Sequence, residues 1–321
     1  MIAHSVLGAM ALKAGNMSVD ILCLGEPMVE FNQQSDGHFL QGFGGDTSNC
    51  AIAAARQGAD VGYMTLLGDD GFGRSILDLW RQEGVDSNAV QCVAGSRTGI
   101  YFVTHGEAGH RFSYYREGSA SARITPADLY PAAFEGIKLL HVSGISQAIS
   151  SSAADTTFAA IEMAKKAGAQ ISYDTNLRLS LWPLDRARAI THAAMQRCDI
   201  ALPGLDDARH LLGTTDPDRI ADFYLDLGAS IVALTVGAEG CLVALPDERR
   251  RIPGREVQAI DATGAGDTFD GAFLARHIAG DDPFEAGRYA NAAAALSTCG
   301  YGAISPMPRA DEVRRFMAEL E

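Results

Sequence analysis

Short apolar runs alternate with amphipathic stretches along most of this chain. Continuous apolar runs this short are typical of strands buried on both faces of a parallel sheet. The pattern therefore predicts an α/β fold with a mainly parallel sheet covered by helices. The predicted strands are VDILCLGE (19–26), VGYMTLLG (61–68), KLLHVSG (138–144), QISYDTN (170–176), DIALPG (199–204), ASIVALTVG (229–237) and GCLVAL (240–245).

Between these runs the spacing of apolar residues predicts helices at 71–84, 153–168 and 187–198. A further predicted helix lies in GGDTSNCAIAAARQG (44–58), where Gly44 and Gly45 precede the helical residues and Gly58 is placed to end them. Its many alanines permit a close approach by a neighbouring element.

The pattern of apolar and polar residues changes between about residues 90 and 121. There TGIYFVTHGEAGHRFSYYREGSA (98–120) alternates β-branched and aromatic residues with polar ones around a glycine-rich turn, which predicts a hairpin with one exposed face. We expect segments 28–42 and 93–121 to form a small β-sheet lid on the α/β body. Residues 17–321 are then a single domain. Residues 1–16 are expected to be an extension or cloning remnant, because Met17 directly precedes the first predicted strand.

Composition narrows the possible partners. Of the 321 residues 47% are hydrophobic and 21% charged, and the net charge of −14 disfavours a polyanion such as DNA or RNA. No run approaches the roughly 18 apolar residues that a membrane span needs. The six cysteines contain no CxxC pair, which favours reduced, buried thiols in a cytoplasmic protein.

Several common site motifs are absent or incomplete. The sequence contains no GxxxxGK[ST] phosphate loop, and GFGGDT (42–47) lacks the last glycine of a dinucleotide fingerprint. Ser143 lacks the GxSxG context of a hydrolase nucleophile. His105 and His110 flank the predicted lid turn, where a surface loop is favoured over a metal site.

One glycine-dense stretch, DATGAGDTFDG (261–271), directly precedes an apolar run that predicts a helix starting near Asp267. Residues with little side chain at a helix N-terminus leave backbone N–H groups accessible, and the helix dipole adds positive potential, so the place suits a phosphate. Asp267 in the first turn is either a structural cap or a general base beside a transferred phosphoryl group. The glycines before it and the lid upstream favour the base.

These residues carry a specific resemblance. DATGAGDTFDGAFL (261–274) resembles the C-terminal signature of the ribokinase-like (PfkB) carbohydrate kinases, and GGDTSNCAIAAARQG resembles their N-terminal signature. The resemblance spans about residues 20–315. It implies a three-layer α/β body whose β-lid closes over a sugar, with ATP as phosphoryl donor. It also implies that Asp267 deprotonates the sugar hydroxyl and that Gly264, Ala265 and Gly266 form the anion hole.

Within the family the chain is most similar to 2-keto-3-deoxygluconate (KDG) kinases, through LGEPMVEF (24–31), TGIYFV (98–103), YYREGSA (114–120), GISQAIS (144–150) and DTNLRLSLW (174–182). This similarity implies that the sugar acid is bound by Gly45, Asn49, Tyr101, Tyr114, Arg116, Arg178 and Asp267. It also implies that the nucleotide is bound by Asn176, Thr235, Gly237, Gly240, Gly264 and Gly266. Planar guanidinium groups suit a carboxylate, which a neutral sugar lacks. Surface or lid salt bridging is the alternative for both arginines.

The chain departs from the family pattern at two places. Tyr301, in CGYGAISP (299–306), stands where some KDG kinases carry an aspartate, so its role is open. Many relatives have an N-x-x-E motif that places Mg²⁺ through water, whereas PGLDD (203–207) offers Asp207 as a substitute. Mg²⁺ itself follows from the chemistry of ATP, and a monovalent cation such as K⁺ is a further candidate.

The sequence therefore predicts an ATP-dependent kinase that phosphorylates KDG at its C6 hydroxyl. A kinase for a neutral sugar such as fructose, or for a nucleoside, is the alternative enzyme. A catalytically inactive sugar-binding sensor is the alternative from another class, against which the intact GAGD sequence argues. We also expect a homo-oligomer formed through the lid, because a small isolated sheet with aromatic faces is marginal unless another surface covers it.

Overall fold

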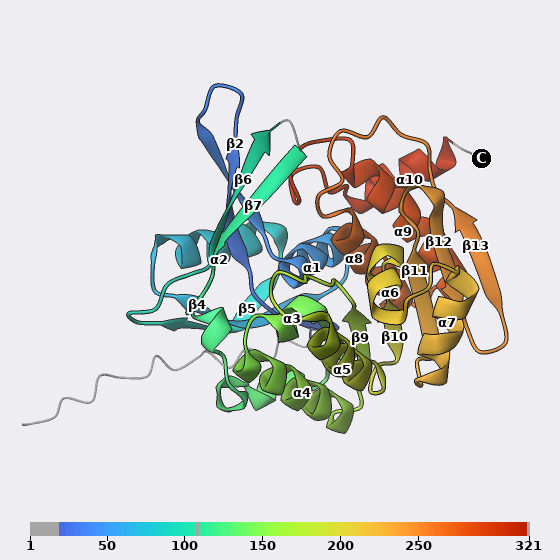
Figure 1. Cartoon of the computed structure of the whole chain (residues 1–321), viewed down its shortest axis with the longest axis horizontal. Helices are drawn as coiled ribbons and strands as arrows, with labels where there is room; N and C mark the ends of the chain where they lie inside the picture. The colour runs from blue at the N-terminus through green and yellow to red at the C-terminus, as the bar shows by residue number, and fades with distance from the viewer. Residues whose placement is uncertain (1–18, 107–108, 320–321) are drawn as a thin grey trace, which may run out of the picture.

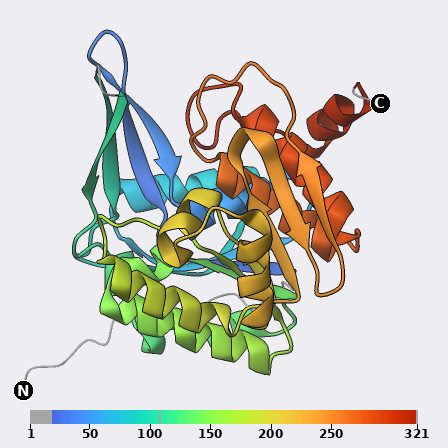
Figure 2. The same cartoon turned by 45° about the vertical axis from the view of Figure 1, so that its right-hand side comes forward.

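The chain forms a large sheet covered by helices on both faces and a small sheet that stands apart from it (Figures 1 and 2). The computed structural model describes residues 19–106 and 109–319. The expected extension at residues 1–16 lies outside the described residues.

The large sheet has nine strands within the described residues, in the order β13-β12-β11-β10-β9-β8-β1-β4-β5. From β5 to β11 all neighbours pair parallel, and β12 and β13 add antiparallel at one edge, so the predicted mainly parallel sheet is confirmed. The strands are β1 (Ile21–Leu24), β4 (Val61–Gly68), β5 (Asp86–Val93), β8 (Leu139–Ser143), β9 (Gln170–Asp174), β10 (Ile200–Leu202), β11 (Ile231–Thr235), β12 (Gly240–Ala244) and β13 (Arg249–Pro253).

Each predicted strand run forms a strand, because its side chains are buried on both faces of the sheet. In β1, Ile21 and Cys23 pack into one core and Leu22 and Leu24 into the other, as the alternation of a strand requires. The first core holds α1 (Asp46–Arg56), α2 (Gly71–Glu83), α8 (Ala265–Ile278), α9 (Pro283–Ser297) and α10 (Ala310–Ala318). The second holds α4 (Ser151–Lys166), α5 (Leu184–Met195), α6 (Leu205–Leu212) and α7 (Pro217–Asp226), and α3 (Gly144–Ala148) packs on α4.

Helices α1 and α8 approach each other unusually closely. A Cβ atom on Gly271 would lie 2.4 Å from the carbonyl oxygen of Cys50 and 2.6 Å from the Cβ of Ala53. The glycine and alanines therefore permit a contact that larger side chains would prevent. As predicted, α1 ends just before Gly58, which has a φ of 93°. Helix α8 starts at Ala265, two residues earlier than predicted.

The small sheet is the predicted lid. Its strands, in the order β3-β2-β6-β7, are β2 (Met28–Gln33), β3 (Phe39–Gly44), β6 (Ile100–Gly106) and β7 (Gly109–Tyr115). Phe31 and Phe102 stack at 5.2 Å between ring centroids within it. The second lid segment begins later than the predicted residue 93, since Val93 belongs to β5 of the large sheet. The first lid segment extends beyond its predicted end at residue 42, because β3 continues to Gly44.

Two findings concern membrane-spanning helices and the burial of the cysteines. No helix in the described part of the chain combines the length and apolarity that crossing a membrane requires. Four of the six cysteines are buried free thiols as predicted, but Cys92 and Cys299 are exposed, so the prediction is wrong for these two. Neither lies in an apolar run of the predicted sheet.

Candidate active site

A cavity of about 1030 Å³ opens at the carboxyl ends of the parallel strands, where ligands bind in open α/β sheets. The N-termini of α1 and α8 and the inner face of the lid complete its wall. The site residues predicted from sequence that line the cavity are Gly45, Asn49, Tyr101, Tyr114, Arg116, Asn176, Arg178, Asp207, Thr235, Gly237, Gly264, Gly266 and Asp267.

Two predicted residues, Gly240 and Ala265, lie outside the cavity wall, as does Tyr301, whose role the sequence left open. Gly240 is buried at the start of β12, where a Cβ would lie 2.1 Å from the carbonyl oxygen of Ile252, so its need for glycine is structural. Ala265 is not in the cavity wall, and its N–H donates to the carbonyl of Ala262 at 3.1 Å. Tyr301 is 76% exposed and lines a separate hollow beside the lid.

The N-terminus of α8 is shaped by glycine. Gly264 is the N-cap in a left-handed conformation (φ 76°), and a Cβ on it would lie 2.9 Å from the carbonyl oxygen of Ala303. A Cβ on Gly266 would meet no atom within 4 Å, so here the missing side chain leaves room in the cavity. The first N–H groups of a helix have no partner within the helix. The arrangement therefore suits an anion at Gly264 and Gly266, with the Ala265 N–H already engaged.

Asp267 stands at the third position of α8 and faces the cavity. Its Oδ2 accepts a 2.7 Å hydrogen bond from Nδ2 of Asn49 on α1. Burial, followed by repulsion from the carboxylate of Asp46, raises the pKa of Asp267 to about 7 against the opposing effects of Asn49 and Arg178. A carboxyl group poised near neutrality is suited to general-base work.

Further carboxyl groups surround Asp267. Burial, followed by repulsion from neighbouring carboxylates, raises the pKa of Asp174 and Asp270 well above the usual range. Burial also raises the pKa of Asp207, although its Oδ2 accepts bonds of 2.9 Å from both Thr175 Oγ1 and the Leu177 N–H. Across residues 19–106 and 109–319 no three His, Cys, Asp or Glu side chains are arranged to hold a metal ion directly.

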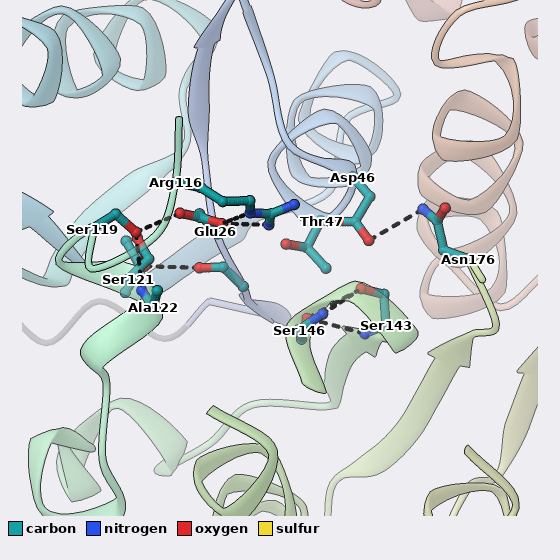
Figure 3. Close-up of polar contacts among 12 residues, drawn as sticks. Glu26, Asp46, Thr47, Arg116, Ser119, Ser121, Ala122, Ser143, Ser146 and Asn176 are labelled. Carbon is teal, nitrogen blue, oxygen red and sulfur yellow. Dashed lines mark hydrogen bonds and ion pairs between the residues drawn. The ribbon is translucent and has the colours of Figure 1, made fainter. Parts of the chain in front are cut away.

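On the lid side, Arg116 is held by a buried carboxylate (Figure 3). Glu26, two residues beyond the end of β1, has a fully buried side chain whose Oε2 accepts a 2.7 Å bond from Arg116 Nε and pairs with Nη2. Ser119 donates to Oε1 of Glu26 at 2.6 Å. Tyr101 similarly donates to Glu30 at 2.6 Å. One edge of the Arg116 guanidinium is thus engaged within the protein, as the salt-bridge alternative requires, while the residue still lines the cavity.

The loop after β9 brings Asn176 to the cavity in a left-handed conformation (φ 25°). Its N–H donates to Asp174 Oδ1 at 3.0 Å, and its Nδ2 donates to Asp46 Oδ2 at 3.2 Å. Arg178, two residues on, is exposed and donates to the neighbouring carbonyl of Leu177 at 2.9 Å. The strands and loops therefore bring the predicted residues together, while their individual roles in binding stay predictions.

Sequence reasoning missed Glu26, Asp46, Asp174 and Asp270 as site residues. A usable signal was present for Glu26, two residues beyond a buried strand, and for Asp174, which ends one, because such sheets bind ligands at the carboxyl ends of their strands. Asp46 follows the glycine pair at the start of α1. Asp270 lies one turn beyond Asp267 on α8, a spacing that places both on one face.

Comparison with known proteins decides the family. Residues 18–310 match the family described as pfkB family carbohydrate kinase. This chain belongs to the PfkB family. The chain is accordingly a sugar kinase, and the ribokinase-like fold predicted from sequence is confirmed.

Two relatives of this PfkB kinase point to different acceptors. It is 33% identical over 313 residues to 2-dehydro-3-deoxygluconokinase from Thermoproteus tenax, covering 94% of this chain and 95% of the relative. It is also 33% identical over 317 residues to fructokinase-1 from Oryza sativa subsp. japonica, covering 92% and 97%. Among solved structures, fructokinase from Xylella fastidiosa with bound ATP has a TM-score of 0.86 at 26% identity, covering 94% of this chain and 98% of that one.

Proposed function

We propose that this PfkB kinase transfers the terminal phosphoryl group of ATP to the C6 hydroxyl of 2-keto-3-deoxygluconate, giving 2-keto-3-deoxy-6-phosphogluconate. The observation that carries the proposal is the pairing of Asp267, poised near neutrality at an anion-binding helix N-terminus, with two arginines in the same cavity wall. Similarity to the Thermoproteus tenax enzyme supports the same acceptor.

In this mechanism Asp267 accepts the proton of the C6 hydroxyl as its oxygen attacks the γ-phosphorus. The bond between that phosphorus and the oxygen of ADP breaks in the same displacement. Backbone N–H groups at the start of α8 stabilise the negative charge on the transferring group, and the helix dipole adds to their effect. Asn49 holds Asp267 in position through its 2.7 Å hydrogen bond.

The size of the cavity supports a site for two small molecules together with a cation. Its volume of about 1030 Å³ is at the upper end for single-ligand pockets, which leaves room for a sugar and a nucleotide. Mg²⁺ keeps several waters and binds through few carboxylates together with phosphates, which agrees with a site that lacks a direct three-ligand cluster among the described residues. Bound Mg²⁺ would neutralise phosphate charge, and Asp207 would hold it through water; K⁺ is a further candidate.

A neutral acceptor such as fructose is the second candidate, and one contact favours it. Glu26 offsets the positive charge of Arg116, which weakens the attraction of that arginine for a carboxylate. Rice fructokinase-1 matches this chain at the same identity as the sugar-acid kinase. An inactive sugar sensor has no comparable support, because the GAGD residues and Asn49 assemble around a poised carboxyl group.

An ATP-consumption assay with KDG, related sugar acids, fructose and ribose tests the acceptor. We expect a wide preference for KDG. Truncating Arg116 to alanine should lower KDG affinity roughly 30-fold or more, because the loss leaves charge unpaired in a partly dry site, and lysine should rescue poorly. Arg178→Ala should lower KDG affinity only about tenfold, since this arginine is more exposed than Arg116.

The control is Arg74→Ala, which removes an exposed arginine on α2 and should leave affinity unchanged. Equal turnover of a neutral sugar, or undiminished KDG turnover in both cavity variants, would overturn the sugar-acid assignment. It would leave the membership of the kinase family untouched.

A further inference from the structure

Glu26 is a buried carboxylate at the base of the lid. Oε2 accepts hydrogen bonds from Arg116, and Oε1 accepts one from Ser119 (Figure 3). The side chain of Glu26 is 0% exposed, so it has no surface with which to touch a substrate. A buried negative charge is costly unless a cation and hydrogen bonds compensate it. A charged group placed here without contact to the reaction calls for an explanation.

The four junctions between the lid and the body converge on Glu26. The residue itself lies two positions before β2. A Cβ on Gly99, directly before β6, would lie 2.7 Å from Oε1 of Glu26. Arg116 directly follows β7, and a Cβ on Gly45, directly after β3, would lie 2.3 Å from the carbonyl oxygen of Glu26. Arg116 is therefore fixed at the root of the lid, where all four lid strands meet the body.

Glu26 engages only one edge of the Arg116 guanidinium. Of the five N–H groups that a guanidinium carries, those on Nε and one on Nη2 point to Oε2. Nη1 has no hydrogen-bond partner among the described residues. The N–H groups that remain on Nη1 and Nη2 form a parallel pair, which is the geometry that binds a planar carboxylate at two points. Arg116 lines the cavity, although its side chain is only 11% exposed.

The ion pair has two opposed effects on a ligand that binds Arg116. The charge of Glu26 weakens the attraction of the arginine for an anion. The same contact removes rotamer freedom from a long side chain, so less entropy is lost when the ligand binds. It also aims the free edge, and for a planar carboxylate a directed pair of donors binds better than a charge without direction. A strongly bound anion thus requires the geometry of the pair as well as the arginine.

We propose that Glu26 is a positioning residue, which acts through Arg116 by presetting the guanidinium edge that binds the acceptor. For KDG the group bound there is the carboxylate, a detail that rests on the function proposed above. Glu26 makes no contact with the acceptor. It fixes the arginine at the root of the lid before the acceptor arrives, and affinity for the acceptor depends on that placement.

The test is a double-mutant cycle on KM for KDG, with Glu26→Gln and Arg116→Ala made singly and together. Glutamine keeps the shape of Glu26 but replaces its charge-assisted bonds with weaker, neutral ones. We expect Glu26→Gln to raise KM for KDG about tenfold with KM for ATP unchanged. In the Arg116→Ala background the same change should alter KM less than about twofold, because no arginine is left to position.

Glu26→Asp separates position from charge. The aspartate keeps the negative charge but withdraws it from Arg116 by one methylene group, so we expect KM for KDG to rise as it does in Glu26→Gln. Glu83→Gln is the matched control. Glu83 also pairs with a largely buried arginine, accepting bonds of 2.9 and 2.7 Å from Arg56, but it lies outside the cavity wall. Its variant should lower the melting temperature and leave KM for KDG unchanged.

Two results would overturn the inference. One is an equal effect of Glu26→Gln with and without Arg116, which would make Glu26 a structural residue. The other is a normal KM for KDG in Glu26→Asp, which would reduce its role to charge balance. If Glu26→Gln does not fold, Ser119→Ala, which loosens the same carboxylate at Oε1, replaces it in the cycle under the same criterion. If the wild type phosphorylates only a neutral sugar, the proposed acceptor is wrong, and the cycle repeated with that sugar decides the role of Glu26.

Discussion

Asp267 illustrates how two environments compete at a single residue. A helix N-terminus favours a negative charge, which lowers the pKa of a carboxyl group in the first turn. Burial and the carboxylate of Asp46 act in the opposite direction, and the pKa of about 7 shows that they prevail. The group is therefore half-protonated near neutral pH in the free protein. A base with this pKa is both available and strong enough to receive a hydroxyl proton.

Asp267→Asn should lower kcat roughly 10²–10⁴-fold, the usual contribution of a positioned base. The same change should raise thermal stability above pH 7. The unfolded carboxyl group ionises near pH 4 and the folded one near pH 7, so wild-type stability falls as pH rises through this interval, and the amide removes that loss. Turnover assays and melting curves at pH 5 and pH 8 measure both effects. Near-normal turnover would return Asp267 to a capping role.

At the scale of elements, the site depends on how α1 and α8 meet. The absence of a side chain at Gly271 lets the two helices touch, and this contact brings Asn49 on α1 within 2.7 Å of Asp267 on α8. The ion pair between Glu26 and Arg116 links the segment after β1 to the segment that follows lid strand β7. The arrangement of the cavity residues thus depends on elements far apart in the chain.

Gly271→Ala and Gly266→Ala on the same helix should separate stability from activity. The first places a methyl group 2.4 Å from backbone, and such overpacking costs about 1–3 kcal/mol, so both the melting temperature and turnover should fall. The second meets open space and should leave the melting temperature unchanged. Its methyl group would enter the anion site, so turnover alone should fall. A stable, active Gly271→Ala protein would contradict the importance of the helix contact.

At the scale of the whole molecule, the lid is the surface with the most exposed apolar side chains. Leu40 and Tyr115 are each 63% exposed, and Phe39 and Phe112 are 43% and 42% exposed. They lie on a four-stranded sheet whose outer strand β3 presents an unpaired edge within the described residues. Exposed apolar patches and unpaired edges of this kind favour association with another chain.

We expect the protein to form a homo-oligomer through the lid. Leu40→Lys adds a charge to the exposed lid strand β3 and should shift the protein toward monomer in sedimentation experiments across a concentration series. Tyr130→Lys, which alters an exposed aromatic residue on the body, should leave the distribution unchanged. A protein that is strictly monomeric at assay concentration and at high concentration would contradict the prediction.

Much of the architecture follows from local patterns. Seven apolar runs correctly predicted strands of the large sheet, because strands buried on both faces must be continuously apolar. Strand β13 went unpredicted, since its arginines suit an exposed edge and carry no apolar signal. Strand β5, half-buried along its length, likewise went unpredicted, and only its last residue, Val93, falls within the predicted lid segment.

The chemical identity of the family was also contained in local sequence, because Gly264, Gly266 and Asp267 are neighbours in the chain and form one helix start. Only the tertiary structure decided how charge is distributed around them. Glu26 and Arg116 are 90 residues apart, and Asp46 and Asn176 are 130 apart, yet each pair is in contact. Burial and pairing depend on distance through space, which neither periodicity nor a motif encodes, and they decide which of these charges remain free to meet a substrate.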